Sequence, residues 1–315
     1  MDTFTKDTFY PVNQPEYSHH FWNYVKGLEG HAEYLGAGKN ESGYQLPTAD
    51  DQKLNRKLNE ESIFRNIATC LYSPGSSSEI KARMNNDTAS WVEPGGSIPI
   101  YDGLDDFTDY NISDHKLAII VKMDDSFLQD NKYSLESYII ERFAGNFARA
   151  EEDGFINGNG ITEPAGILHA TAGAETGVTA ESLTYDSVID LFFSVDKDYR
   201  KKGIWLMNDS TALTLRKLKD GAGNPLWNHS NDTILGKPVY ISNYMPDADD
   251  GEKAIAFGDF RYYWVVDRTN INIQVLREKF FETMQIGYLA SERLDGKLIR
   301  SEAIKVLKIA ENEQS

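Results

Sequence analysis

Residues 133–168 constrain the fold more than any other part of the sequence, because a long helical period there ends abruptly. Apolar residues recur every three or four positions, and at 3.6 residues per turn they lie on one face of a helix. The residues of this face are Leu135, Ile139, Phe143, Phe147 and Ala150. Three glycines (158, 160 and 166) and Pro164 then stop the helix. The stretch therefore predicts one long amphipathic helix followed by a tight turn.

The turn itself is similar to the start of a dinucleotide-binding fingerprint. That fingerprint needs a third small residue three positions after Gly160, where helix and strand approach closely. The residue at that position is Glu163, and the glycines follow a helix rather than a strand. We therefore interpret Gly158-Asn159-Gly160 as a turn with a required backbone shape, and we predict no nucleotide site.

The charge balance argues against a surface that grips phosphate. The 315 residues include 49 acidic and 32 basic ones, for a formal net charge of −17. Nucleic-acid surfaces gain their affinity from clustered Lys and Arg. The single cysteine, Cys70, cannot form an intrachain disulfide.

The N-terminal region has neither the basic start nor the apolar core of a signal peptide, and no run of about 18 apolar residues occurs in the chain. We expect the protein to be made and used in the cytoplasm, or released by lysis, without contact with a membrane. Residues 1–46 are polar and aromatic, and Trp22 lies in a segment that favours one short helix. Because the segment has little capacity for a core of its own, we expect an arm that docks on a neighbouring subunit.

An acidic hairpin is the next feature along the chain. Residues 53–68 favour helix, with Ser62 as the cap of a new start, and residues 115–121 favour a strand. Between them, residues 85–114 contain no Lys or Arg but seven acidic residues: Asp87, Glu93, Asp102, Asp105, Asp106, Asp109 and Asp114. We expect this hairpin to project outwards, since it would be repelled by an acidic body.

The second half of the chain mixes helices and strands. We predict a helix over residues 185–200, a buried strand over 204–207, and a helix capped by Asn208 or Asp209. Further strands are expected over 235–241, 254–258 and 262–276. Asp295-Gly296 is a strong two-residue turn motif, and it predicts a hairpin between strands 281–294 and 297–309. The fold class is α+β.

No catalytic, cofactor or metal site is predicted. His19-His20 has no partner at a metal-ligand spacing, and the other histidines are isolated in the sequence, so we interpret the pair as solvated. The adjacent Glu151, Glu152 and Asp153 point in different directions from one helix and do not make a catalytic pair. Trp205, Trp227 and Trp264 are expected in the core.

Several stretches resemble, in the same order, the HK97-like major capsid proteins of tailed double-stranded-DNA bacteriophages. The first is the helix end and turn, residues 150–160 and 163–168. The others are 89–93 (ASWVE), 205–208 (WLMN), 215–220 (LRKLKD), 234–239 (ILGKPV) and 255–260 (IAFGDF). No single motif is decisive, but their joint order is specific, and the resemblance runs from about Pro15 to Ala310.

The resemblance implies a domain layout and a function. It implies an N-terminal arm (1–68), an extended hairpin called the E-loop (69–122), a spine helix with the first part of a peripheral domain (123–179), an axial domain (180–266) and the rest of the peripheral domain (267–315). The expected protein is not an enzyme. It self-assembles through hexamers and pentamers into an icosahedral shell around phage DNA, without reading the DNA sequence, in the cytoplasm of the host.

Two departures from the family pattern bear on assembly. Some members join neighbouring subunits by a Lys–Asn isopeptide bond promoted by a Glu. Here the hairpin tip has no Lys, and Met284 and Ser291 stand where that Asn and Glu would lie, so we predict no cross-link. A long N-terminal scaffolding segment does not precede Pro15. We expect either that it was removed or that scaffolding is a separate protein, beside a portal and a protease or decoration proteins.

Five residues are candidates for assembly contacts: Trp22 in the arm, Trp91 and Val92 in the hairpin, and Phe143 and Phe147 in the spine. For the two phenylalanines, ordinary core packing is an equal alternative. A nanocompartment shell of the same fold, which encloses protein cargo, is a second interpretation. A soluble hydrolase that uses carboxylates is a third, from a different class.

Overall fold

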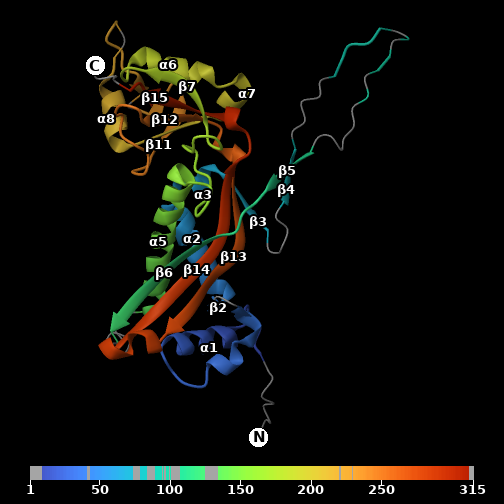
Figure 1. Cartoon of the computed structure of the whole chain (residues 1–315), viewed down its shortest axis with the longest axis vertical. Helices are drawn as coiled ribbons and strands as arrows, with labels where there is room; N and C mark the ends of the chain where they lie inside the picture. Colours follow the sequence, from blue (N-terminus) through green and yellow to red (C-terminus); the bar gives the residue numbers. More distant parts are fainter. Residues whose placement is uncertain are drawn as a thin grey trace.

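The computed structural model of the chain describes residues 9–40, 43–73, 79–83, 89–93, 95, 97–98, 100, 107–124, 134–219, 221–228 and 230–311. They form an elongated molecule with two packed units, stacked end to end, and a hairpin that leaves the body near their junction (Figure 1). The lower unit contains the long helix and a long antiparallel sheet. The upper unit contains a mixed sheet with helices on it.

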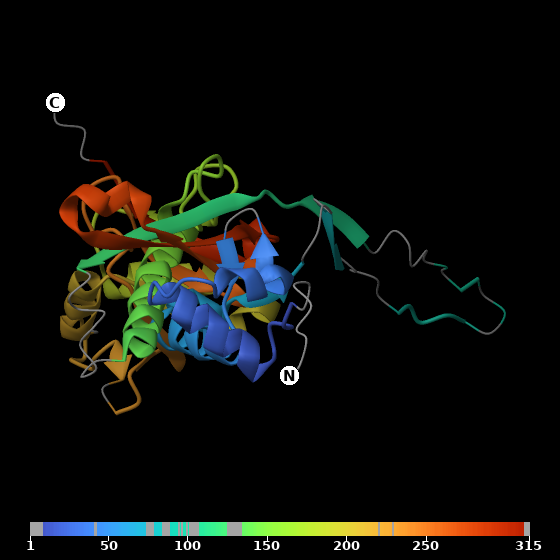
Figure 2. The ribbon, with the colours of Figure 1, turned by 90° about the horizontal axis from the view of Figure 1, so that it is seen from below.

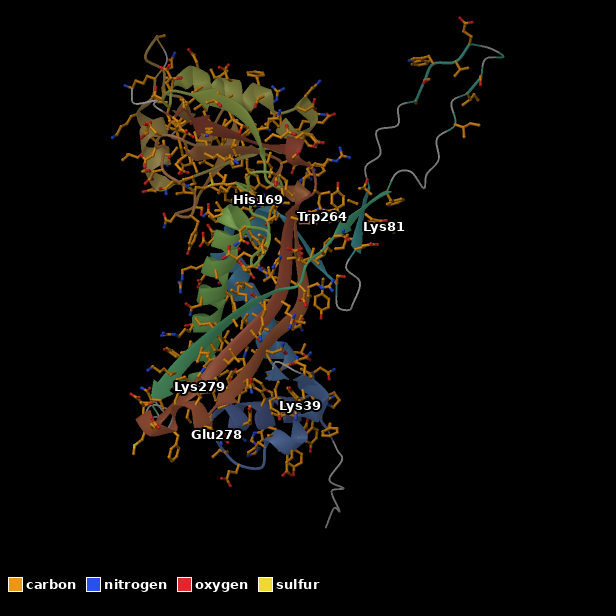
Figure 3. All side chains as sticks on the ribbon, viewed as in Figure 1. Lys39, Lys81, His169, Trp264, Glu278 and Lys279 are labelled. Carbon is orange, nitrogen blue, oxygen red and sulfur yellow. The ribbon has the colours of Figure 1, made fainter. Side chains whose placement is uncertain are left out.

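The lower unit is built along the predicted spine helix, α5 (Leu135–Asn157). Its N-cap, Ser134, accepts a hydrogen bond from the Ser137 amide, which satisfies one of the free donors of the first turn. Strands β6 (His115–Asp124), β14 (Gln285–Leu298) and β13 (Tyr263–Leu276) run antiparallel beside it. Figure 3 marks the length of this unit with labelled residues. Trp264 lies at one end of β13, and Glu278 and Lys279 lie beyond its other end.

The buried face of α5 differs in one position from the predicted one. Leu135, Ile139, Phe143 and Phe147 are buried as expected, but Ala150 is exposed. The stripe instead continues through Glu151. This residue lies four positions after Phe147 and so keeps the four-residue spacing of the buried face. Helix α2 (Thr48–Glu61) packs along α5 through Leu54 and Leu58.

The N-terminal segment packs on its own chain, and the expectation that it docks on a neighbouring subunit stays a prediction. Helix α1 (Pro15–Val25) buries four side chains in the core cluster that also contains residues of the spine and β14: Tyr17, Phe21, Trp22 and Val25. The Trp22 indole donates a 2.8 Å hydrogen bond to Asp50 on α2. Short 3-10 helices η1 (Ala32–Tyr34) and η2 (Gly36–Gly38) and strands β1 (Lys39–Asn40) and β2 (Gly43–Gln45) then lead to the edge of β13.

The upper unit is organised on a sheet of order β7-β15-β12-β8-β11-β10-β9. The predicted strands are present as β8 (Ile204–Met207), β11 (Lys237–Ile241) and β12 (Lys253–Gly258), with short strands β9 (Trp227–Asn228) and β10 (Thr233–Ile234) at the edge. Helix α8 (Asp209–Lys217) is capped by Asn208, as predicted. Trp205 and Trp227 are buried in this unit, whereas Trp264 is only half-buried in the lower one.

The predicted helix 185–200 is two helices. Helix α6 (Tyr185–Ser194) ends at Val195, which is extended, and α7 (Lys197–Arg200) starts anew after Asp196. The Asp196 carboxylate accepts a hydrogen bond from the Asp198 amide, so the chain gains a second N-cap where the sequence pattern suggested continuity.

Two strands of the upper sheet lie outside the residues expected for the axial domain. Strand β7 (Glu175–Ala180) pairs in parallel with β15 (Ile304–Ile309), and β15 pairs antiparallel with β12. The boundaries expected for the axial domain, 180 and 266, therefore separate β7 and β15 from the other strands of their sheet. A further core cluster includes Phe155, Tyr263, Leu206 and Val306, and it joins the two units.

The predicted hairpin at Asp295-Gly296 is wrong, because both residues lie inside β14, where they pair with Val266 and Val265. The Asp295 carboxylate accepts hydrogen bonds from the Ser113 and Gly296 amides instead of closing a turn. A Cβ at Gly296 would lie 2.4 Å from the Tyr263 hydroxyl, so the glycine makes room for packing. The actual connection from β13 to β14 is the 3-10 segment η4 (Glu278–Thr283), and η5 (Ser301–Ala303) precedes β15.

The turn after the spine explains its alternating asparagines and glycines. Asn159 Oδ1 accepts hydrogen bonds from the amides of Ile161 (2.8 Å) and Thr162 (2.9 Å), which closes a side-chain turn. Asn157 Nδ2 donates to the Tyr244 carbonyl at 2.9 Å and ties the helix end to the upper unit. A Cβ at Gly158 would meet the Pro164 carbonyl at 2.1 Å. The prediction that this segment is a shaped turn is confirmed.

Candidate assembly surfaces

The hairpin is the largest feature that makes little contact with its own chain. Strands β4 (Glu79–Arg83) and β5 (Phe107–Asn111) pair with each other and continue away from the body (Figures 1 and 2). Apolar side chains beyond them are open to solvent: Trp91 is 104% exposed, Ile100 94% and Ile98 73%. The predicted outward projection is confirmed for the described residues, and the acidic positions 87, 102, 105 and 106 lie outside them.

A buried ion cluster lies beside the outgoing strand of the hairpin. Arg65 lies on helix α3 (Ile63–Ile67). This helix is followed directly by strand β3 (Thr69–Tyr72), which pairs with β13. The Arg65 guanidinium donates to both oxygens of Glu151 on α5 (2.7 and 2.6 Å) and to both oxygens of Asp267 on β13 (3.0 Å each). Two bidentate pairs fix the direction of the arginine as well as its position. The cluster therefore joins the spine and the sheet to the segment from which the hairpin starts.

Glu292, on β14, adds a third carboxyl group to this cluster. It is 4% exposed, and both burial and the neighbouring Glu151 raise its pKa well above the usual range. The raised pKa favours the protonated form of Glu292, which can share a hydrogen bond with Glu151. The sequence carried a signal for this residue that was missed: Glu292 occupies the inward register of a strand whose other inward residues are Tyr288, Ala290 and Leu294.

The returning strand of the hairpin is fastened by polar contacts to β14. The Ser113 amide donates to Asp295, and Arg293 donates to Asp114 at 2.5 Å. Tyr110 donates to the Ile299 carbonyl at 2.9 Å. The root of the hairpin is thus held on both strands, while its outer part presents apolar side chains to solvent.

The five predicted assembly residues fall into two groups. Trp91 and Val92 are exposed on the hairpin, as an interface contact requires. Trp22, Phe143 and Phe147 are at most 7% exposed and pack in the lower core. For these three the structure shows core packing, and a role in assembly stays a prediction.

The histidines are closer together than the sequence suggested. His31 is not isolated, because its Nδ1 lies 2.8 Å from Nδ1 of His20, and the ring of His19 is 6.1 Å from that of His31. His115 Nε2 lies 3.4 Å from Asp295. Among the described residues, no group of three His, Cys, Asp or Glu side chains is arranged to hold a metal ion.

The three neighbouring carboxylates at the end of the spine point in different directions, as predicted. Glu151 binds Arg65, Glu152 accepts a 2.5 Å hydrogen bond from Ser242, and Asp153 contacts Asn157. None of the helices in the described ranges is both long and apolar enough to cross a membrane.

Comparison with known proteins decides the family. The sequence matches the family described as "Phage capsid family" over residues 42–309. The chain belongs to the phage capsid family. No curated protein sequence matches it.

Solved capsid structures resemble this phage capsid family chain over most of its length. The capsid of an empty GTA particle matches with a TM-score of 0.61 and 28% identity, over 79% of this chain and 90% of that one. The capsid of a native GTA particle has the same score and identity, and 97% of its chain is covered. A structure from Microbacterium phage Oxtober96, with a TM-score of 0.57 and 16% identity over 79% of this chain and 91% of that one, shows the shared fold.

The resemblance to HK97-like major capsid proteins is confirmed, and with it the α+β fold class. The family and its structural neighbours are shell proteins, so the chain is a structural capsid protein of the virion.

Proposed function

We propose that this protein assembles through hexamers and pentamers into an icosahedral shell that encloses phage double-stranded DNA. Assembly would take place in the cytoplasm of the host bacterium. A separate scaffolding protein, a portal and a protease or decoration proteins would be its partners. The shell would enclose DNA without sequence-specific contacts, in keeping with the net charge of −17.

The observation that carries the proposal is the exposed apolar hairpin. Soluble monomers rarely expose several large apolar side chains, such as Trp91 and Ile100, on one extended hairpin. The apolar side chains of such a hairpin are removed from solvent when the hairpin lies on a second copy of the chain. In a closed symmetric assembly each copy both gives and receives the same contact, so modest interfaces are multiplied.

The domain layout supports the same proposal, with one refinement. We propose 1–68 as the arm, 69–122 as the E-loop, and 123–179 with 267–315 as the peripheral domain, which includes the spine. The axial domain of 180–266 would be completed by β7 and β15, because both strands belong to its sheet. The symmetry axes of the capsomers would then lie at the upper unit in Figure 1.

Electron microscopy of the purified protein tests the proposal, because shells, capsomers and single subunits differ on sight. Replacing Trp91 by Ser should raise the concentration needed for assembly by roughly tenfold or more, since a buried aromatic anchor is often worth about 2 kcal/mol. Trp91→Phe is the matched variant and should retain most assembly. Wild-type protein that stays monomeric with its partners present, or a Trp91→Ser protein that assembles normally, would contradict the role of the hairpin.

The enclosed material separates the DNA-filled shell from a cargo-enclosing compartment. Particles purified from infected cells and treated with nuclease should retain protected double-stranded DNA. Particles that hold only protein would favour the nanocompartment.

A further inference from the structure

A notch interrupts the edge of β13 near the root of the hairpin. Strand β3 pairs with β13 over Trp264–Asp267, and β2 pairs with it at Asn272 and Ile273. Between these pairings, residues 268–271 have no strand on that side within the described part of the chain. A cavity of about 270 Å³ opens there. Its lining is mostly polar: Asn55, Asn59, Arg65, Cys70, Tyr72, Asp267, Thr269, Asn270, Ile271 and Glu292.

One buried polar atom of the notch lining has no hydrogen-bond partner within the described part of the chain. Oε1 of Glu292 is buried and makes no hydrogen bond, although the residue is 4% exposed and lines the cavity. Buried polar atoms nearly always form a hydrogen bond, and a buried atom without one costs about 1–3 kcal/mol. The neighbouring arginine cannot help, because Arg65 already donates to Glu151 and Asp267.

The notch also holds more negative than positive charge. The carboxylates of Glu151 and Asp267 both pair with the guanidinium of Arg65, so two negative charges face one positive charge among the described residues. The carboxyl group of Glu292, whose pKa is raised, lies beside them. Asp51 lies nearby. Burial, together with the negative charge of Asp267, raises the pKa of Asp51 to about 6. The Asp267 side chain remains 28% exposed, so a group that enters from outside can reach it.

We propose that this notch receives a lysine or arginine side chain from a neighbouring copy of the chain in the shell. The inference rests on the proposed function, because the cation comes from a second subunit. An ammonium or guanidinium group donates hydrogen bonds without needing to accept any, which suits the free Oε1 of Glu292 and the exposed oxygens of Asp267. A cavity of about 270 Å³ is large enough for one such side chain.

Docking of the cation changes the protonation of Glu292. In the free subunit, burial and the neighbouring Glu151 favour the protonated form of the carboxyl group. A cation in the notch favours the carboxylate, so the carboxyl group releases its proton to solvent and forms an ion pair. Assembly should therefore release protons and become stronger as pH rises.

Proton release during assembly tests the inference. Wild-type protein is assembled in weakly buffered solution, and the pH change is recorded with an indicator dye. Glu292→Gln should release fewer protons per copy than the wild type, and its assembly should weaken and lose most of its dependence on pH. Glu141→Gln is the matched control, because Glu141 is exposed on the outer face of α5. Circular dichroism of both free subunits verifies that they are folded.

The outcomes separate this inference from the proposed function. If wild-type protein forms no shells, both fail. If shells form and Glu292→Gln matches Glu141→Gln in proton release and pH dependence, the notch is not a cation receptor, although the protein still builds a shell.

Discussion

At the scale of single residues, the histidine cluster links protonation to the packing of the N-terminal segment. The His20 ring stacks on Tyr34 (4.3 Å between centroids) and Tyr10 (5.4 Å). Its Nδ1 shares one hydrogen with Nδ1 of His31 at 2.8 Å, so one of these two nitrogens must be unprotonated. Burial, His31 and His19 lower the pKa of His20.

The lowered pKa sets the sign of the pH dependence. The folded chain holds His20 neutral more strongly than the unfolded chain does, so its stabilising effect is present above the ordinary pKa of about 6.5. That effect is lost as pH falls below this value. Glu16, Glu29 and Glu33 lie on the same segments, but among the described residues none forms an ion pair with these imidazoles.

We expect His31→Gln to raise the pKa of His20. Glutamine can still bond to His20 Nδ1, but it carries no proton-dependent charge. Two-dimensional NMR titration of the free subunit measures the effect, with His19→Gln as a second variant in the same cluster. An unchanged His20 titration in His31→Gln would show that the two rings do not interact in solution.

At the scale of the elements, Gly296 shows how close packing fixes the long strand β14. A Cβ at this position would lie 2.4 Å from the Tyr263 hydroxyl and 2.8 Å from the Phe155 ring. Tyr263 is fully buried and its hydroxyl donates to the Ala165 carbonyl at 3.0 Å, so it has little freedom to move. The strand, the spine and the turn after it therefore meet at one glycine.

Gly296→Ala should destabilise the subunit by about 1–3 kcal/mol, because added volume in a packed core forces its neighbours apart. Gly221→Ala is the matched control, since nothing lies within 4 Å of a Cβ built there. Chemical denaturation of the two variants measures the difference. If both variants had the same free energy of unfolding, the core around Tyr263 could accommodate the added methyl group without loss of stability.

The elements also show what the sequence can and cannot predict. Helix α5 and strand β8 were predictable because local period and caps such as Ser134 act over a few residues. The Asp295-Gly296 motif misled because its preference for a turn is weaker than the long-range pairing of β14 with β13 and β6. The notch at Glu292 was beyond prediction as a whole, since Arg65, Glu151 and Asp267 are far apart in sequence and meet only through the fold.

At the scale of the whole molecule, we expect the chain to build its shell without the covalent cross-link that some members of the family form. An isopeptide bond needs a lysine amine, an asparagine amide and a carboxylate that moves the proton. Residues 85–114 contain no Lys. Met284, which stands at the expected asparagine position, is 83% exposed at the β13–β14 connection, and a thioether forms no amide. Ser291, at the expected glutamate position, is 2% exposed.

The carboxyl group next to that position, Glu292, is not placed for this chemistry. Glu292 is buried against Glu151, and it lies in the notch of the same subunit rather than beside Met284. We therefore expect assembled shells, boiled in denaturant with a reducing agent, to run as one band near 35.6 kDa. The reducing agent removes any disulfide made through Cys70, the only cysteine in the chain. A ladder of larger bands under these conditions would show a cross-link between other residues, and it would mean that the shell does not depend on non-covalent contacts alone.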